Sequence, residues 1–177
     1  MNIEFFSDLY RHMEWADSTV WKAVMECEEA KSDEKLLRYL THIHLVQKFF
    51  LLTWRGEPRP TSFPTFETAG PLLDWARPYY DEAFNYLKAY QPEHISEPVP
   101  LAWASMVEKL LGRAPAMTTL GDTMLQVPLH TLYHRGQVNA RLREVSGTPP
   151  LVDYIAWVWF GRPGANWSEV VPQSEPN

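Results

Sequence analysis

Four long amphipathic stretches, joined by connections rich in proline, constrain the fold of this chain more than any other feature. Apolar residues recur at spacings of three and four over residues 3–28, 33–54, 72–90 and 119–145. This periodicity is typical of helices that bury one face. No segment has a strong strand pattern. We therefore predict an all-α protein built as a four-helix bundle, a fold that places metal sites between facing helices.

Local residue types set the ends of the second helix. Asp33 is a good N-cap, and Gly56 and Pro58 are expected to stop the helix after Trp54. Residues 59–71 contain three prolines, so we expect them to form a loop.

The last long helix is predicted to begin near Thr119 or Gly121 and to end at Val145, ahead of a Ser-Gly pair and two prolines. Pro128 lies inside this helix. Because proline removes a backbone hydrogen bond, we expect a kink just before the segment that begins at His130.

Two further segments have weaker patterns. Residues 99–103 alternate weakly, which allows a small β-hairpin with residues 116–119 before the last long helix. Residues 153–160 are apolar and are expected to cap the bundle as a short helix or strand. We assign residues 1–164 to a single domain and residues 165–177 to a C-terminal tail that is extended or frayed.

Composition excludes several classes of partner. The chain has 177 residues and a net charge of −6, which argues against nucleic acid as the main partner because phosphate binding needs a basic surface. Cys27 is the only cysteine, so no intramolecular disulfide forms and a reducing compartment fits. The sequence shows no signal-peptide pattern and no apolar run of about 20 residues that would span a bilayer. We expect a cytoplasmic protein without a membrane partner.

His130 and His134 stand four residues apart in the last long helix. This spacing projects both imidazoles from one face, about one turn apart, so both can reach a single metal ion. Imidazole suits zinc, nickel, copper and iron(II). Thr131 stands where a zinc protease of the His-Glu-x-x-His type has its glutamate, which excludes that class. A good site needs a third ligand from another helix.

The second helix offers two candidates for that ligand. His42 and His44 each lie about 100° from the centre of its apolar face, on opposite flanks. Periodicity does not choose between them. We expect His94 to be solvated in a loop and His12 to be a partly exposed histidine.

Several short stretches resemble the DinB/YfiT superfamily. They are Leu-Thr-His-Ile at 40–43, Tyr-His-Arg-Gly-Gln at 133–137, Pro-Leu-Val-Asp-Tyr-Ile at 150–155 and, in the first helix, Trp-Ala-Asp at 15–17. The likeness covers residues 5–160, and His-Arg-Gly-Gln is its most specific part. The resemblance implies a four-helix bundle, often homodimeric, that holds a divalent metal with three histidines.

By this resemblance the metal ligands are His42, His130 and His134, and zinc and nickel both fit them. The sequence departs from the family pattern at two places. Gln126 stands where many members have another histidine, which is not usually a ligand. Gln47 and Lys48 replace an acidic residue that is common after the histidine of the second helix.

Residues beyond the pair are candidates for binding a small-molecule substrate. Gln137 and Arg141 follow His134 by one and two turns on the same face, and Trp15 is a third candidate. Arg135 points elsewhere and is expected to form an ion pair that fixes the helix.

Three imidazoles leave at least one coordination position open, as in catalytic sites. Such a position can bind water or a thiol and lower its pKa. The superfamily includes thiol-dependent S-transferases and isomerases, so the resemblance implies a metal-dependent enzyme that activates a low-molecular-weight thiol. The alternatives are a metal-dependent hydrolase and a non-catalytic metal-binding stress protein. Asp17 and Asp122 are the available general bases, but both suit structural roles, so no catalytic residue is assigned.

Apolar surface also bears on assembly. Gly136 and Ala140 are small residues on one helix face, and Trp157 and Trp159 belong to a tryptophan-rich segment. Together they offer more apolar surface than one small bundle hides. We expect a homodimer with two-fold symmetry.

Overall fold

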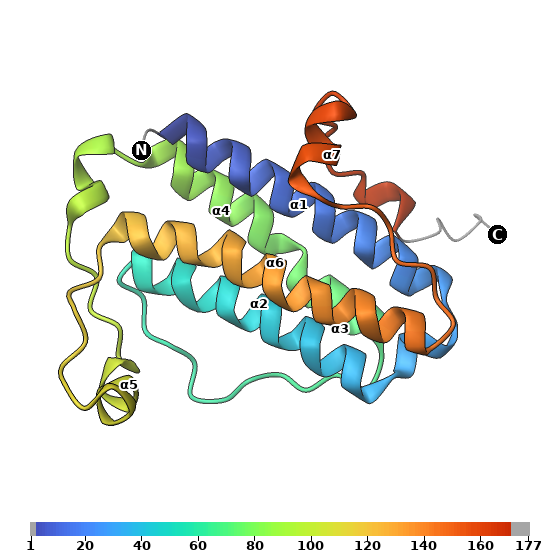
Figure 1. The fold of residues 1–177 in the computed structure, drawn as a ribbon, viewed down its shortest axis with the longest axis horizontal. Helices are drawn as coiled ribbons and strands as arrows, with labels where there is room; N and C mark the ends of the chain where they lie inside the picture. The colour runs from blue at the N-terminus through green and yellow to red at the C-terminus, as the bar shows by residue number, and fades with distance from the viewer. Residues whose placement is uncertain (1–2, 171–177) are drawn as a thin grey trace.

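A computed structural model describes residues 3–170 of the chain, and these residues form helices and loops without any strand. The all-α prediction is therefore confirmed for this part of the chain. Figure 1 shows the long helices running side by side. Along the chain the elements are α1 (Ile3–Glu26), the 3-10 helix η1 (Glu29–Ser32), α2 (Glu34–Trp54), α3 (Ala69–Ala76), α4 (Pro78–Ala89), η2 (Pro92–Ser96), α5 (Ala104–Leu111), α6 (Leu120–Glu144), α7 (Tyr154–Trp159) and η3 (Trp167–Glu169).

The pairing of α2 with α6 is the most extensive contact between elements, and α1 packs on both α6 and α4. Their apolar faces form two core clusters, one toward each end of the helices. Trp21 is buried in the first cluster, and Phe6 and Tyr79 are buried in the second. The cores hold α2 and α6 in contact along their lengths, and this pairing positions the candidate site.

Both predicted helix starts are found. Asp33 caps α2, where its carboxylate accepts a hydrogen bond of 2.8 Å from the backbone N–H of Leu36. Thr119 caps α6 in a reciprocal arrangement with Asp122, each side chain accepting from the backbone N–H of the other residue. Such caps satisfy N–H groups that lack a partner within the helix. Beyond its cap, α6 passes through Pro128 without a break.

The third predicted helix is two helices. α3 ends at Ala76 and α4 begins at Pro78, because proline has no N–H to continue the hydrogen-bond ladder and favours the first position of a helix. α3 also begins at Ala69, inside the stretch predicted as a loop. Pro71 is compatible with this start, since N–H groups of a first turn have no intrahelical acceptor.

The β-hairpin that the alternation allowed is not formed. A single antiparallel bridge joins Pro98 and Thr119, and the N–H of Val99 donates to the carbonyl of Thr118 at 2.8 Å. Prolines 98 and 100 cannot donate to a ladder, so the pairing stops there. The following residues form α5 instead, which buries none of its side chains.

The start of the predicted tail is packed. Trp167 donates to the carboxylate of Glu14 at 2.9 Å, Lys22 pairs with Glu169 at 2.7 Å, and Val170 is buried. The packed chain thus extends past the boundary predicted at residue 164, because these contacts fasten η3 to α1. The rest of the predicted tail, residues 171–177, lies outside the described residues. Within the described part, none of the helices is both long and apolar enough to cross a bilayer.

Candidate metal centre

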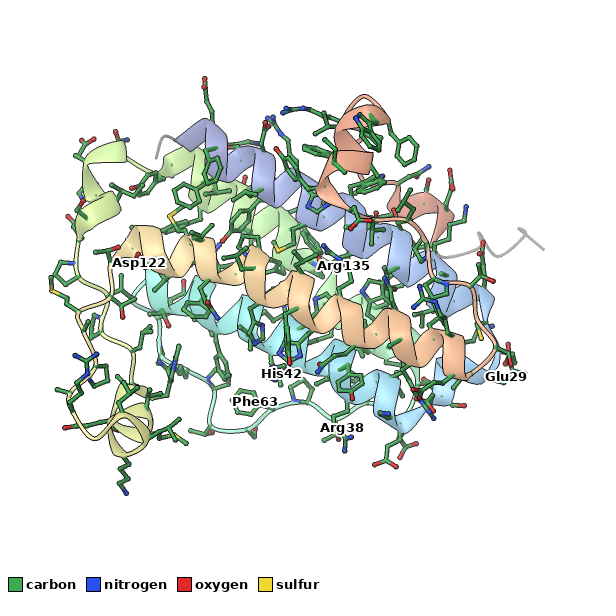
Figure 2. The ribbon with its side chains drawn as sticks, viewed as in Figure 1. Glu29, Arg38, His42, Phe63, Asp122 and Arg135 are labelled. Atoms are coloured by element: carbon green, nitrogen blue, oxygen red, sulfur yellow. The ribbon has the colours of Figure 1, made fainter. Side chains whose placement is uncertain are left out.

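Three histidines from two helices converge in the groove between α2 and α6. His42 projects from α2, and His130 and His134 project from one face of α6. One ring nitrogen of each lies within 4.8 Å of one from both others. Figure 2 shows the His42 side chain lying between the two helices. Two imidazoles one turn apart on α6 and a third imidazole on α2 therefore form one group of three.

The spacing of these nitrogens suits a single ion. Nε2 of His42 lies 3.3 Å from Nε2 of His130. Two nitrogens that each bind a tetrahedral ion at about 2.0–2.1 Å stand roughly 3.3–3.4 Å apart. The donor set, three imidazoles, is one that zinc and nickel accept.

Gln137 fixes the orientation of His134. The Nδ1 atom of His134 lies 2.7 Å from the amide Oε1 of Gln137. A carbonyl oxygen only accepts, so Nδ1 carries the proton and donates. The lone pair of His134 is then on Nε2 and available to an ion. The structure thus gives Gln137, predicted as a substrate contact, a bond to a ligand residue.

The surroundings keep two of the imidazoles neutral. Burial, and after it the proximity of His134 and His42, lowers the pKa of His130 to about 4. Burial, followed by the proximity of His134, also lowers the pKa of His42. A neutral imidazole has a lone pair for a metal, whereas a protonated one does not. His130 and His42 are therefore ready to bind at neutral pH.

His44, the other candidate on α2, is turned into the core. It is 1% exposed, and its Nε2 accepts a hydrogen bond of 3.1 Å from the indole of Trp21. Its Nδ1 donates to Oε1 of Gln47 at 2.8 Å. Both ring nitrogens are occupied by the core. The structure therefore brings His42, and not His44, together with the pair on α6.

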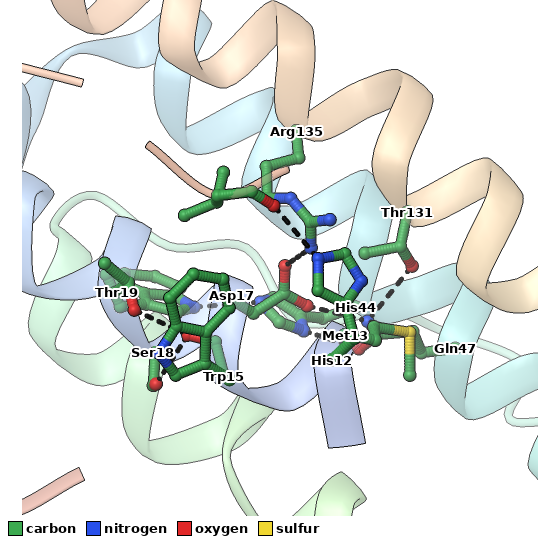
Figure 3. Close-up of polar contacts among 12 residues, drawn as sticks. His12, Met13, Trp15, Asp17, Ser18, Thr19, His44, Gln47, Thr131 and Arg135 are labelled. Carbon is green, nitrogen blue, oxygen red and sulfur yellow. Dashed lines mark hydrogen bonds and ion pairs between the residues drawn. The ribbon is translucent and has the colours of Figure 1, made fainter. Parts of the chain in front are cut away.

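A buried polar network centres on Asp17, and Figure 3 shows it with Gln47, Thr131 and Arg135. The guanidinium of Arg135 donates to Asp17 at 2.7 Å, so the ion pair expected of Arg135 is present. Tyr80 donates to the other oxygen of Asp17 at 2.5 Å. The amide of Gln47 donates to Asp17 and to Thr131, each at 3.2 Å. Because the network joins α1, α2, α4 and α6, it fixes the helix from which the histidine pair projects.

Sequence reasoning did not find the roles of Gln47 and Tyr80. Gln47 follows His44 by three residues, a spacing that could have indicated contact on one helix face. Tyr80 comes from a distant segment, and no local pattern marks it. Asp17 is committed to this network, which leaves it no free oxygen to act as a base at the histidines.

The other predicted substrate contacts have structural partners. Arg141 donates to both oxygens of Asp33, at 3.0 and 2.7 Å, and to Glu144 at 2.7 Å. It therefore ties α6 to the N-cap residue of α2. Trp15 is 8% exposed and packs against Phe160 beneath α7. Whether either residue also contacts a substrate stays a prediction.

The remaining histidines lie elsewhere. His12 is 7% exposed rather than partly exposed, and its Nε2 donates to the carbonyl of Val152 at 3.0 Å. This bond lets the core accept a polar ring. His94 is exposed, as expected, but it lies in η2 rather than in a loop, and it pairs with Glu97.

Comparison with protein-family models, with curated proteins and with solved structures gives no match to this chain. No relative therefore supplies a family or an activity.

Proposed function

We propose that this protein is a divalent-metal-dependent enzyme of the DinB/YfiT type, which activates a low-molecular-weight thiol for attack on a small electrophile. The observation that carries the proposal is the convergence of His42, His130 and His134, with 3.3 Å between the first two Nε2 atoms. Zinc and nickel are the proposed ions, and the cytoplasm is the proposed location.

The proposed fold is a four-helix bundle. Three of its four helices are α1, α2 and α6. The fourth consists of α3 and α4, which are separated at Pro78. The packing of α1 on α6 and α4, and of α2 on α6, supports it. A site between facing helices is where such bundles hold metal.

Three protein ligands distinguish an open site from a closed structural one, which uses four. A bound divalent ion would supply a Lewis acid that lowers the pKa of a thiol or a water near neutral pH. His42 is exposed at the edge of the groove, so a small molecule can approach from solvent. The chain's own contribution is to hold His42 and His130 neutral and, through Gln137, to orient His134.

The lack of a free carboxylate base beside the three histidines, among the described residues, favours thiol transfer over hydrolysis. Within the described residues the group contains histidines alone. Hydrolysis uses a positioned base to activate water, and Asp17 is held by Arg135 and Tyr80. A thiol that has lost its proton needs no separate base during attack.

The test begins with elemental analysis of the purified protein, followed by a thiol-conjugation assay with and without the ion found. We expect conjugation only with the ion, and none in the His134→Ala variant, which should not bind metal. His44→Gln is the matched control because His44 lies on α2 but faces the core. It should keep both metal and activity.

Other outcomes would overturn the proposal. A fully metallated protein that is inert across a broad panel of thiols and electrophiles is not a thiol transferase. If that protein cleaves esters or amides, it is a hydrolase. If it does neither, metal binding itself is its function.

A further inference from the structure

A hollow of about 380 Å³ lies between α2 and α6, and His130, one of the three histidines, is part of its lining. A volume of this size falls within the range of small-molecule sites, about 300–1,000 Å³. The residues that matter among its lining are Val46, Phe49, Arg59, Trp103, Gln126 and His130. None of the predicted substrate contacts lines it.

The hollow continues the histidine site along the groove. His130 belongs to both, because it lines the hollow and is one of the three converging imidazoles. Val46 follows His42 by four residues on α2, and Gln126 precedes His130 by four on α6. Residues four apart share a helix face. A molecule in the hollow therefore has one end at His130.

The walls of the hollow are largely apolar and aromatic. Phe49 and Val46 line it from α2, and Trp103 lines it from the segment before α5. The ring of Trp103 is held edge-to-face against Phe50, with 5.5 Å between ring centroids. Such walls bury an aromatic or aliphatic body, since transferring apolar surface out of water is favourable.

Arg59 is the one cation among the residues that line this hollow. Its guanidinium carbon lies 4.6 Å from the ring centroid of Trp103 and 5.7 Å from that of Phe49. These rings hold the guanidinium by cation–π attraction. Arg59 is only partly exposed, yet it forms no hydrogen bond or ion pair with any described residue. Its fork of N–H donors is left for a ligand.

Three other arginines have a carboxylate partner within the chain. Arg135 pairs with Asp17, Arg141 pairs with Asp33, and Arg55 pairs with Glu82. A guanidinium fork matches a carboxylate with two parallel hydrogen bonds. Because the hollow provides a single cation among apolar walls, it suits one carboxylate on an apolar body better than a doubly charged phosphate.

We propose that this hollow binds a small aromatic or aliphatic carboxylate, with its carboxylate on Arg59, its body against Phe49 and Trp103, and its other end at His130. Binding of such an anion needs no metal. Its role as the electrophilic substrate rests on the proposed function, which places the reacting group beside the histidines.

The experiment uses 4-phenylbutyrate and its neutral counterpart 4-phenylbutanol as probes, titrated calorimetrically into metal-free and metal-loaded full-length protein. Wild type should bind the acid more tightly than the alcohol in both states. Arg59→Gln should lower the affinity for the acid by roughly tenfold to a hundredfold, the range for hydrogen bonds to a charged group. It should leave the affinity for the alcohol unchanged. Arg113→Gln, an exposed arginine outside the hollow, is the matched control and should change neither affinity.

Val46→Phe supplies a second variant that acts through shape. The larger side chain fills the hollow, so the affinity for both probes should fall although Arg59 is unchanged. Equal affinities of wild type for acid and alcohol, or an Arg59→Gln variant that binds the acid like wild type, would overturn the inference. Unfolding temperatures of all variants should match wild type within a few degrees. If Arg59→Gln melts earlier, Arg59→Lys replaces it, and that variant should lose most of the preference for the acid over the alcohol.

The two proposals fail separately. If metal-free protein binds the acid through Arg59 but no thiol is conjugated, the anion site stands and the transferase does not. If thiols are conjugated to neutral electrophiles and Arg59→Gln changes nothing, the transferase stands and the anion site does not.

Discussion

The Nδ1 atom of His134 lies 2.7 Å from Oε1 of Gln137, one turn further along α6. This bond selects the tautomer of His134 that presents Nε2 to the groove. Partners of this kind raise the affinity of a metal site although they do not touch the ion.

Gln137→Leu should therefore weaken metal binding by about tenfold to a hundredfold without loss of helix content. Gln137→Glu should bind at least as well as wild type, because a carboxylate also accepts the proton of Nδ1. Competition with a chromophoric chelator measures both affinities. His94→Gln is the control, since His94 is exposed and paired with Glu97. Unchanged affinity in Gln137→Leu would show that the bond does not support the site.

Asp17→Asn should destabilise the protein strongly. It leaves the buried guanidinium of Arg135, 2% exposed, without its counter-charge. Breaking one side of a buried ion pair costs about 3–5 kcal/mol. Urea unfolding of the metal-free protein measures the change in the free energy of unfolding.

Glu169→Gln is the control for that comparison. It removes an ion pair with Lys22 that is open to solvent, and exposed pairs contribute little. Stability should stay close to that of wild type. If Asp17→Asn and Glu169→Gln have the same stability, the buried network does not hold the helices together.

The metal-free protein should lose stability as the pH falls below about 6.5. Burial lowers the pKa of His44 below its ordinary value, and burial does the same at His12. Below the ordinary histidine pKa of about 6.5, the unfolded chain therefore binds more protons than the folded chain. The free energy of unfolding has its full value above that pH and declines below it.

His44→Gln removes one of these sites. The decline between pH 7 and pH 5.5 should be smaller in this variant than in wild type, whatever its stability at pH 7. His94→Gln, which changes a solvated histidine, should decline like wild type. Urea unfolding in chelator at each pH gives the curves, and parallel curves for wild type and His44→Gln would contradict the assignment.

The sequence predicted those features that depend on residues within one or two helical turns. The N-cap at Asp33 was predicted because a capping side chain acts within three residues of its own position, and the start of α6 was predicted near Thr119 or Gly121. The pair His130 and His134 was found because helical spacing puts both on one face. The single long helix predicted at 72–90 was wrong because Pro78, seven residues past Pro71, has no N–H to continue the hydrogen bonds of the preceding turn.

Contacts between distant segments were beyond the sequence. His42 and His44 are equivalent by periodicity; the resemblance favoured His42, and the packing of α2 against α6 brings its ring to the pair on α6. The approach of Arg59 to Trp103 joins two proline-rich connections 44 residues apart, and neither has a periodic pattern that predicts contact. α5 was missed because prolines 98, 100 and 115 flank this short stretch. Its apolar side chains, among them Met106 and Leu110, are exposed in the single chain.

A surface formed by α6 and α7 bears on assembly. It carries large apolar side chains that are exposed in the single chain: Leu132, Tyr133, Leu151, Ile155 and Trp159. A side chain built at Gly136 would meet nothing within 4 Å, so no helix of the described chain covers this part of α6. Exposed apolar patches of this kind mark interaction sites.

We propose that this surface joins two copies of the chain, and we expect a homodimer with twice the 20.6 kDa of one chain. The double variant Leu132→Glu, Ile155→Glu should be monomeric, because burying two carboxylates at an apolar contact is unfavourable. Leu110→Glu is the control: Leu110 is 86% exposed on α5, away from this surface, and its variant should stay dimeric. Light scattering at micromolar concentration measures the mass, and a wild-type value of one chain would refute the dimer.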